Sequence, residues 1–467
     1  MQEHFTEEQI EEQRKKVFGE QPYAQLVRPC RIGDGILRLE ADEKNRAISI
    51  FERYRGQLTF FIPASGSGSR MVEFLHEYRN SSSEELTGKM ELFINHLEEF
   101  AFFKELPEPL QQSIVQNEVD IDSLVDYLLD AHGLDLSSIP KGLIPFHYFG
   151  PFILNAFQEH LLQGNLLSTL PANFHFTIQK DFEEKISQSV ENISKFTGIT
   201  FNVRYSEQSA RTNSVAFNEK KEPYKLADGS ILTRPSGHGA LLPILNTIYS
   251  ELILVKNIDN VQHFSKAEQT NQVWRVIAGV LLEFRAQAQR IFETPSTNEL
   301  FELNKRYQLF NQETIAAVTE LEAVRKLLDK PVRVCGMVRN EGQPGGGPFW
   351  VMNNGKISKQ IVEKAQISME HDQRNILLKS THFNPVMMAL CPLNLVGEKF
   401  DITQFKDENT YFIVHKSNNG ENISYMEQPG LWNGSMADWI TLFVETPSET
   451  FSPVKSLTDL IDPSHRE

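Results

Sequence analysis

Runs of apolar residues bounded by turn-forming residues mark the strands that this chain is expected to form. The first strong run covers residues 57–64 and leads into a loop rich in serine and glycine. Later runs predict strands at residues 174–178, 201–205, 252–256, 332–339, 411–415 and 440–445. Helical stretches separate most of these runs, so the pattern predicts an α/β protein with a mainly parallel sheet covered on both faces.

Apolar positions at spacings of three and four predict helices elsewhere in the chain. Residues 6–18 are highly charged and predict an exposed helix, and an irregular segment is expected to follow through residue 35. A helix from Leu86 to Phe100 is predicted behind a cap at Ser81 and Ser82, with Glu84 and Glu85 three residues further on. Further helices are predicted at 124–129 and 151–162, and residues 72–138 and 266–329 are expected to be helical insertions.

The composition is that of an ordinary globular protein, with 40% hydrophobic and 23% charged residues among 467. This length suits two or three domains, or one elaborated α/β domain. The balance of 46 basic against 62 acidic residues argues against a nucleic-acid surface but leaves room for a small anionic substrate in a locally basic cleft.

The three cysteines lie far apart in the sequence, so neither a disulfide framework nor a metal cluster is expected, and a reducing compartment fits. The first residues are polar and acidic, unlike a signal peptide, and no run approaches the roughly 18 apolar residues of a membrane span. We therefore expect a cytoplasmic protein.

The serine- and glycine-rich loop after the first strand is the strongest candidate for chemistry. Gly66 and Gly68 have no Cβ, so their backbone N–H groups can approach an anion closely. Arg70 would add a fixed cation with several donors. The loop is not a P-loop, which would read G-x-x-x-x-G-K-[ST]. It is not a dinucleotide-binding fingerprint either, because Met71 stands where the third glycine of that pattern belongs. A flexible turn without a ligand is the alternative.

Three later positions could take part in the same chemistry. Asp259 follows the strand at 252–256, where a carboxylate could hold Mg²⁺ bound to phosphates, although an Asx turn would also explain it. Lys141 stands between a proline and a glycine, and a surface lysine is the alternative. Gly237 and Gly239 flank His238, which suits backbone packed against a flat base or sugar, or a plain turn. No G-x-S-x-G, H-E-x-x-H or C-x-x-C pattern occurs.

These loops occur in the order found in sugar-phosphate nucleotidyltransferases. Residues 64–71 resemble the opening signature of that superfamily, written A-G-G-x-G-T-R-L or A-A-G-S-G-S-R-M. Pro140 and Lys141 resemble its Pro-Lys pair, which normally follows the arginine closely; here the lysine lies 71 residues on (141 − 70), across the predicted insertion. Residues 361–364 resemble the I-V-E-K segment of the smaller bacterial relatives.

Three further segments resemble the larger UDP-sugar pyrophosphorylases. Residues 234–242 are similar to their P-x-G-[NH]-G loop, 255–261 to their V-x-N-x-D-N strand end, and 445–455 to their E-F-x-P-[VL]-K segment. The motifs together span residues 60–455. The spacing and the insertions indicate a separate bacterial branch, a domain family of unknown function. Ser65 replaces a usual glycine and Ser69 a usual threonine.

The resemblance implies a Rossmann-like nucleotide-diphospho-sugar transferase fold with a mostly parallel mixed sheet. It implies an N-terminal helical extension at 1–56, a nucleotidyltransferase-like catalytic domain at 57–385 and a C-terminal lobe at 386–467. The implied reaction joins a nucleoside triphosphate and a sugar 1-phosphate, giving a nucleotide sugar and pyrophosphate with Mg²⁺ as cofactor. The base, the sugar and the oligomeric state stay open.

The resemblance also assigns site residues. The implied catalytic residues are Arg70, Lys141 and Lys455, and the implied metal ligand is Asp259. The implied nucleotide contacts are Ala64, Ser65, Gly66, Ser67, Gly68, Ser69, Gln208, Gly237, His238 and Gly239, and the implied sugar contacts are Glu363, Asn384 and Asn433.

Arg70, Lys141, Asp259 and Lys455 are expected to meet in one crevice. Two alternatives remain. One is a catalytically silent protein that binds a nucleotide or nucleotide sugar. The other is a cytidylyltransferase-like enzyme that acts on a non-sugar alcohol phosphate.

Overall fold

The computed structural model describes residues 5–81, 88–342, 345–353, 355–418 and 420–467. The chain divides into two compact units of three segments each. Unit 1 comprises Met1–Phe51, Gln208–Ile253 and Ile277–Thr446, and unit 2 comprises Glu52–Glu207, Leu254–Val276 and Pro447–Glu467. The segment expected to be a C-terminal lobe, 386–467, is therefore divided between the units. The predicted helix start at Ser82, Glu84, Glu85 and Leu86 lies outside the described residues.

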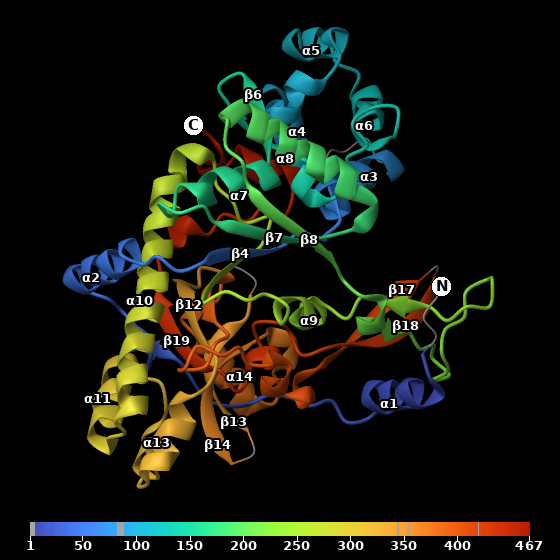
Figure 1. Cartoon of the computed structure of the whole chain (residues 1–467). Helices are drawn as coiled ribbons and strands as arrows, with labels where there is room; N and C mark the ends of the chain where they lie inside the picture. Colours follow the sequence, from blue (N-terminus) through green and yellow to red (C-terminus); the bar gives the residue numbers. More distant parts are fainter. Residues whose placement is uncertain (1–4, 82–87, 343–344, 354, 419) are drawn as a thin grey trace. The chain divides into compact units, whose positions relative to one another are not determined.

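The sheet of unit 2 has the strand order β11-β4-β7-β8 (Figure 1). Its strands are β4 (Leu58–Pro63), β7 (Asn173–Ile178), β8 (Asn202–Glu207) and β11 (Leu252–Lys256), whose last three residues belong to this unit. β4 pairs in parallel with β7, and β7 with β8. The continuous apolar runs of β4 and β11 suit strands that are buried on both faces, whereas β8 is partly exposed at the edge.

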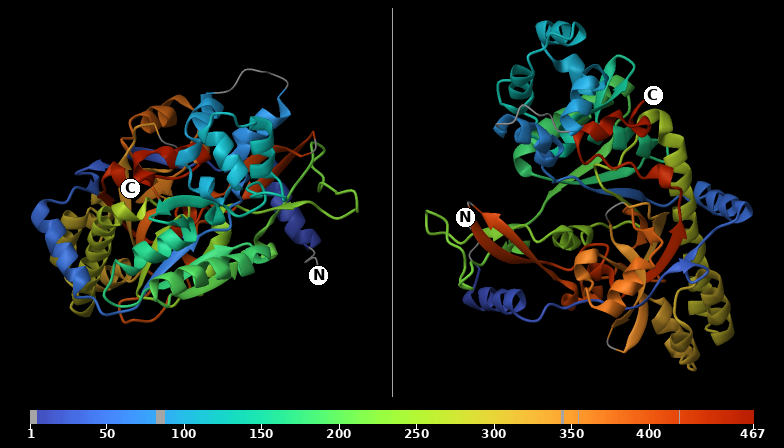
Figure 2. Two further views of the ribbon diagram at one scale, coloured as in Figure 1. Left: turned by 90° about the horizontal axis from the view of Figure 1, so that it is seen from above. Right: turned by 180° about the vertical axis from the view of Figure 1, so that it is seen from behind.

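Among its described residues, unit 2 also contains six further α-helices and one small hairpin. They are α3 (Glu73–Asn80), α4 (Gly88–Asn95), α5 (Glu108–Val115), α6 (Ile121–Leu129), α7 (Ala156–Asn165), α8 (Glu183–Thr197), β5 (Pro145–Phe149) and β6 (Phe152–Asn155). The helix predicted to begin at residue 151 begins instead at Ala156, where Asn155 and Gln158 form a capping box. Figure 2 shows the C-terminal residues beside the helices that follow β4, and η14 (Leu457–Ile461) packs against α4.

The main sheet of unit 1 is mixed. Its order is β2 (Arg31–Ile32), β3 (Gly35–Leu37), β19 (Ile440–Glu445), β12 (Val332–Arg339) and β16 (Met387–Cys391), and β15 (His382–Phe383) also pairs with β12. β3, β19 and β12 are parallel, but β12 pairs antiparallel with both β16 and β15. Parallel and antiparallel neighbours therefore occur together, which confirms the mixed sheet that was expected, and its Rossmann-like, mostly parallel character stays a prediction.

Unit 1 also contains a three-stranded antiparallel sheet and two hairpins. The strands are β1 (Gln25–Pro29), β13 (Gly347–Asn353) and β14 (Lys356–Val362), with hairpins β9 (Ser214–Val215)–β10 (Thr233–Arg234) and β17 (Phe412–Asn418)–β18 (Glu421–Glu427). β1, β2 and β3 occupy the segment that was expected to be irregular, so that prediction was wrong. β1 and β3 pair with strands more than 300 positions later in the chain, and β2 pairs with β3.

The helices of unit 1 are α1 (Glu7–Phe18), α2 (Ala41–Glu52), α9 (Leu242–Leu245), α10 (Ala267–Glu293), α11 (Thr297–Tyr307), α12 (Gln312–Ala316), α13 (Leu321–Leu328) and α14 (His371–Leu378). Glu52 and the first ten residues of α10 are counted with unit 2. α1 is less exposed than expected, because Val17 packs in a cluster with Val215, Phe217 and Tyr411. Within the described residues, no helix is both long and apolar enough to cross a membrane.

Candidate active site

Two lysines and one aspartate form an ion-paired cluster in unit 2, which we call the lysine–aspartate cluster. Lys141 Nζ donates to Asp259 Oδ2 at 3.0 Å, and Lys455 Nζ donates to the same oxygen at 2.7 Å. The side chains of Lys141 and Asp259 are 12% and 10% exposed, whereas that of Lys455 is 60% exposed. The fold thus brings together three of the four residues that were predicted to meet.

The serine- and glycine-rich loop after β4 holds the backbone of Lys141. Lys141 N–H donates to the Gly66 carbonyl at 3.1 Å, and Gly68 N–H donates to the Ile139 carbonyl at 3.1 Å. A Cβ on Gly68 would lie 2.8 Å from the Ile139 carbonyl oxygen and 2.8 Å from Ile144 Cδ1, so this approach requires glycine. Residues 72–138 therefore form an insertion, because the chain leaves this loop after Arg70 and returns to it at Lys141.

Asp259 is anchored through the backbone on both of its sides. Ile258 N–H donates to the Pro63 carbonyl at the end of β4 at 3.2 Å, and Val454 N–H donates to the Asp259 carbonyl at 2.9 Å. The second bond places Lys455, the next residue, directly beside the carboxylate. The ends of β4 and β11 therefore carry the loop and the aspartate, and the C-terminal segment adds the second lysine.

Burial and charge act in opposite directions within this cluster. Burial disfavours the charged form of Asp259, but Lys141 and Lys455 outweigh it and hold the pKa of the carboxyl below its usual value. For Lys141 the balance is reversed, since burial lowers the pKa of the ammonium despite the attraction of Asp259. The two lysines share one carboxylate, so the cluster carries more positive than negative charge.

The guanidinium group of Arg70, the fourth residue of the predicted group, makes no hydrogen bond or ion pair with any described residue. Arg70 lies in η1 (Gly68–Val72) and is exposed. The exposed Ser67 caps this turn by accepting a hydrogen bond from Ser69 N–H at 3.1 Å. Ala64, by contrast, is buried and its N–H donates to the Thr177 carbonyl at 3.0 Å, which is a structural role.

The residues of the cluster fit a magnesium ion that arrives together with phosphate. Asp259 Oδ1 is buried and has no hydrogen-bond partner among the described residues. One free carboxylate oxygen suits one bond to Mg²⁺, whose remaining ligands are then phosphate oxygens and water. No group of three His, Cys, Asp or Glu residues able to hold a metal occurs in the part of the chain that the structure describes.

Three further predicted residues, His238, Glu363 and Asn433, meet in unit 1, and together with Trp432 we call them the His238 cluster. Glu363 Oε1 accepts hydrogen bonds from His238 Nε2 at 3.1 Å and from Asn433 Nδ2 at 2.8 Å. His238 Nδ1 accepts from Leu431 N–H at 2.8 Å, so the ring proton lies on Nε2. Burial opposes ionisation of Glu363, but His238 and Asn433 outweigh it and keep the pKa of the carboxyl below its usual value.

Several predicted site residues carry buried polar atoms that lack a partner. Among the described residues, seven buried side-chain polar atoms have none, and four belong to predicted site residues. These four are Asp259 Oδ1 in unit 2 and Gln208 Nε2, Asn384 Nδ2 and Asn433 Oδ1 in unit 1. A buried polar atom without a partner is costly and suggests a ligand or an ordered water.

The glycines on either side of His238 have a structural explanation of their own. Gly237 has φ of 69°, in the left-handed region that favours glycine. A Cβ on Gly239 would lie 2.1 Å from the Pro429 carbonyl oxygen. The contact of these glycines with a base stays a prediction, and His238 is partly exposed.

Trp432 was missed by the sequence reasoning. Its ring stacks on His238 with centroids 3.9 Å apart and planes 11° apart, and its carbonyl accepts from the buried Arg333 Nη1 at 2.6 Å. Its position next to the predicted Asn433 was the only signal in the sequence.

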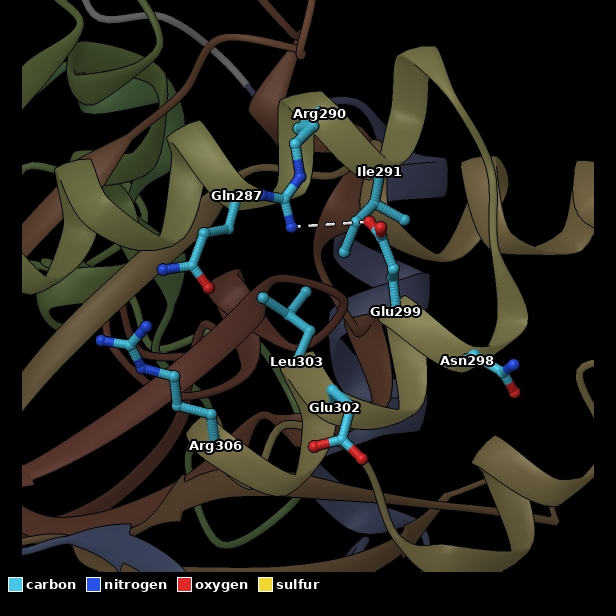
Figure 3. A pocket seen from close by; sticks show the side chains of 8 residues that line it. All are labelled: Gln287, Arg290, Ile291, Asn298, Glu299, Glu302, Leu303 and Arg306. Carbon is cyan, nitrogen blue, oxygen red and sulfur yellow. Dashed lines mark hydrogen bonds and ion pairs between the residues drawn. The ribbon is translucent and has the colours of Figure 1, made fainter.

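A groove of about 370 Å³ lies between α10 and α11 (Figure 3). Arg290, Glu299, Glu302 and Arg306 are among its lining residues, and Arg290 pairs with Glu299 at 3.5 Å. The groove shares no residue with either cluster, so we do not assign the predicted chemistry to it.

The solved structures that this chain resembles include three pyrophosphorylases or phosphorylases of UDP-sugars. UDP-N-acetylglucosamine pyrophosphorylase from Trypanosoma brucei, in complex with an inhibitor, is 12% identical, with 97% of this chain and 74% of that chain covered and a TM-score of 0.49. A protein from Entamoeba histolytica described as the same enzyme is 11% identical, with 91% and 82% covered and a TM-score of 0.47. UDP-glucose phosphorylase from Trypanosoma brucei is 12% identical, with 95% and 71% covered and a TM-score of 0.42.

Among curated proteins, none matches the chain. The prediction of a domain family of unknown function is confirmed by a match that covers nearly the whole chain, and the bacterial origin stays a prediction. Residues 1–466 match the family described as domain of unknown function (DUF4301), and the chain belongs to that family.

Proposed function

We propose that this protein is a Mg²⁺-dependent nucleotidyltransferase that joins a nucleoside triphosphate and a sugar 1-phosphate, releasing pyrophosphate. One observation carries the proposal. Lys141 and Lys455 converge on Asp259 beside the serine- and glycine-rich loop, and Asp259 Oδ1 is buried without a partner. An ammonium pair, a free carboxylate oxygen and a loop with exposed backbone match the needs of a phosphate chain and its metal ion.

The reaction needs alignment and charge neutralisation more than a strong base. The attacking oxygen of a sugar 1-phosphate is already anionic, and the bond that breaks lies between the α- and β-phosphates. Lys141, fixed by Gly66 and largely buried, is suited to stabilise charge that develops at the α-phosphate. Arg70 and the exposed loop would bind the β- and γ-phosphates.

Lys455 is the more accessible of the two lysines and would bind the sugar phosphate. Each ammonium group has three donors and uses one on Asp259, so two stay available for phosphate oxygens. A magnesium ion on Asp259, when bound, would neutralise phosphate charge and help to keep the reacting groups in line.

The His238 cluster is proposed to bind the hydroxyl groups of the sugar. Glu363 is a strong acceptor, Asn433 Oδ1 is an acceptor without a partner, and Asn384 Nδ2 is a donor without a partner. A hydroxyl group both donates and accepts, so it can satisfy such a set. Gln208 Nε2 is an unpaired donor and is proposed to contact the base.

The test is pyrophosphate release by the full chain with Mg²⁺, each common nucleoside triphosphate and a panel of sugar 1-phosphates. Release that requires both substrates supports the proposal. The matched control for losses caused by substitution is Lys195→Ala. Lys195 is an exposed lysine of unit 2, and its one ion pair among the described residues is with Glu191 on the same helix.

Two other results would redirect the assignment. Binding of a triphosphate or a nucleotide sugar without pyrophosphate release would indicate a catalytically silent binding protein. Release that needs a non-sugar alcohol phosphate would indicate a cytidylyltransferase-like enzyme. No binding and no release with any pair of compounds would contradict the proposal.

A further inference from the structure

A chain of three buried polar side chains connects the C-terminal segment to the interior of unit 2. Glu159 Oε1 is hydrogen-bonded to His147 Nδ1 at 2.7 Å, and His147 Nε2 is hydrogen-bonded to His465 Nδ1 at 2.9 Å. All three residues are buried. We call this arrangement the Glu159–His465 chain.

Glu159 and His147 have hydrogen-bond partners at all their side-chain polar atoms. The second oxygen of Glu159 accepts from Gln163 Nε2 at 2.8 Å, so both oxygens have partners. Both ring nitrogens of His147 are used, one toward α7 and one toward the C-terminal segment. Burial, followed by repulsion from His147, lowers the pKa of His465 to about 3. His465 is therefore neutral at physiological pH and acts as a hydrogen-bonding group.

The segment that ends at His465 is the one that carries Lys455. Residues 447–467 form only short 3₁₀ turns, so few of their contacts come from regular structure of their own. The segment is held by the buried side chains of Val454, Leu457 and Leu460. Polar bonds add to this: Val454 N–H to the Asp259 carbonyl, Ser452 N–H to Asn260 Oδ1, and Gln262 Nε2 to the Glu449 carbonyl. The Glu159–His465 chain fixes its far end.

Lys455 depends on this anchoring more than Lys141 does. Its side chain is 60% exposed, so packing contributes little to its position, and its Nζ is placed by the backbone that carries it. Lys141, at 12% exposure, is held from both sides. A shift of the C-terminal backbone would therefore move Lys455 away from Asp259 and leave Lys141 in place.

We propose that the Glu159–His465 chain is a positioning device that fixes the C-terminal segment so that Lys455 Nζ stays against Asp259. Glu159, His147 and His465 touch no substrate in this scheme and act only through Lys455. The catalytic part of this inference rests on the proposed function, whereas the positioning part rests on the geometry alone.

A matched pair of substitutions at His465 tests the positioning. The amide of asparagine reaches the place of the ring Nδ1, whereas that of glutamine reaches the place of Nε2. The bond to His147 uses Nδ1, so His465→Asn should keep it and His465→Gln should break it. Both replacements are neutral, as His465 itself is. The control is Arg466→Ala. Arg466 lies on the same C-terminal segment as His465, and this substitution removes its ion pair with Glu99.

The first measurement is hydrogen–deuterium exchange of the backbone amides in residues 452–456 of the full chain. It needs no enzymatic activity. We expect faster exchange in His465→Gln, and rates near those of the unmodified protein in His465→Asn and Arg466→Ala. Equal rates in His465→Gln and His465→Asn would overturn the proposal, and so would faster exchange in Arg466→Ala alone.

The second measurement is pyrophosphate release, with kcat and KM determined separately. A displaced cation can cost about 10²-fold in rate, so kcat should fall by roughly 10- to 100-fold in His465→Gln. The double variant Lys455→Ala/His465→Gln should be no slower than Lys455→Ala, because His465 acts through Lys455. If the rate losses of the two single variants multiply in the double variant, the inference is overturned. An unmodified protein that releases no pyrophosphate would instead contradict the proposed function and leave the exchange test standing.

Discussion

Lys141 has the features of a fixed catalytic cation. Its ammonium group is largely buried, bonded to one carboxylate, and set in place by a backbone hydrogen bond to Gly66. A cation held in this way needs little reorganisation when charge develops beside it, which is the condition under which electrostatic stabilisation is largest.

Removing this cation should slow the reaction strongly. Lys141→Ala is expected to reduce kcat by about 10²–10³-fold with the fold intact, and we expect a loss of similar size for Arg70→Ala. Pyrophosphate release and far-ultraviolet circular dichroism measure the two quantities. Near-normal turnover in folded Lys141→Ala, with Lys195→Ala as the control, would exclude the role assigned to Lys141.

Asp259 is expected to link the site to magnesium. Asp259→Asn keeps the size of the side chain but removes the charge, so the response of activity to Mg²⁺ should disappear. Mg²⁺ binding measured directly in the presence of triphosphate should weaken as well. An unchanged magnesium titration of Asp259→Asn would show that the metal is held by other residues.

Lys256 lies buried at the end of β11, and burial lowers its pKa to about 7, with only partial opposition from Glu159. Between about pH 10 and pH 7, Lys256 is therefore protonated in the unfolded chain but neutral in the folded chain. Lys256 therefore lowers the free energy of unfolding progressively as the pH falls from about 10 to about 7.

Lys256→Met should remove that effect. The variant should be more stable than the unmodified protein at pH 7, by an amount on the order of 4 kcal/mol, and the difference should shrink toward pH 10. Urea unfolding at the two pH values measures it. A difference that does not change with pH would mean that the ammonium group is not desolvated.

At the scale of elements, the pairing of the loop after β4 with residues 139–141 is the feature that builds the site. Gly68→Ala should destabilise the protein by about 1–3 kcal/mol, because the added Cβ would meet the Ile139 carbonyl and Ile144 at 2.8 Å. Gly66→Ala is the matched control, since no atom lies within 4 Å of its added Cβ. Equal urea midpoints for the two variants would contradict this.

The strands that the sequence predicted best are those that are buried throughout. The predicted bounds of β11, β12 and β19 match the structure, because long apolar runs between turns leave little choice. β13 and β14 were not predicted, since β14 is partly exposed and interrupts its apolar residues with lysine, serine and glutamine. The direction in which β16 pairs with β12 is a tertiary property that no local pattern encodes.

The candidate site was likewise predicted in part from the sequence. The order of the motifs was enough to predict that Lys141, Asp259 and Lys455 meet. It could not predict that His147 and His465, separated by 318 residues, are hydrogen-bonded, because neither lies in a recognisable motif. The stacking of Trp432 on His238 likewise depends on two loops that only the folded chain brings together.

At the scale of the whole molecule, each unit is assembled from three separate segments of the chain. Ligand binding should therefore be visible in the thermal stability of the full chain. A nucleoside triphosphate with Mg²⁺ at about 100 times its Kd should stabilise the folded state by about 2.7 kcal/mol and raise Tm. Differential scanning calorimetry measures the rise, which should be much smaller for Asp259→Asn. An equal rise in both proteins would place the ligand elsewhere.

The long insertion between Arg70 and Lys141 has a consequence for how the protein folds. Closing a loop of 71 residues (141 − 70) costs about 2 kcal/mol more chain entropy than closing one of about nine residues, since each doubling adds about 0.6 kcal/mol. The helices within the insertion have packing partners of their own and can shorten the effective loop before it closes. Compaction of the helices within this insertion should therefore come before the serine- and glycine-rich loop closes on Lys141.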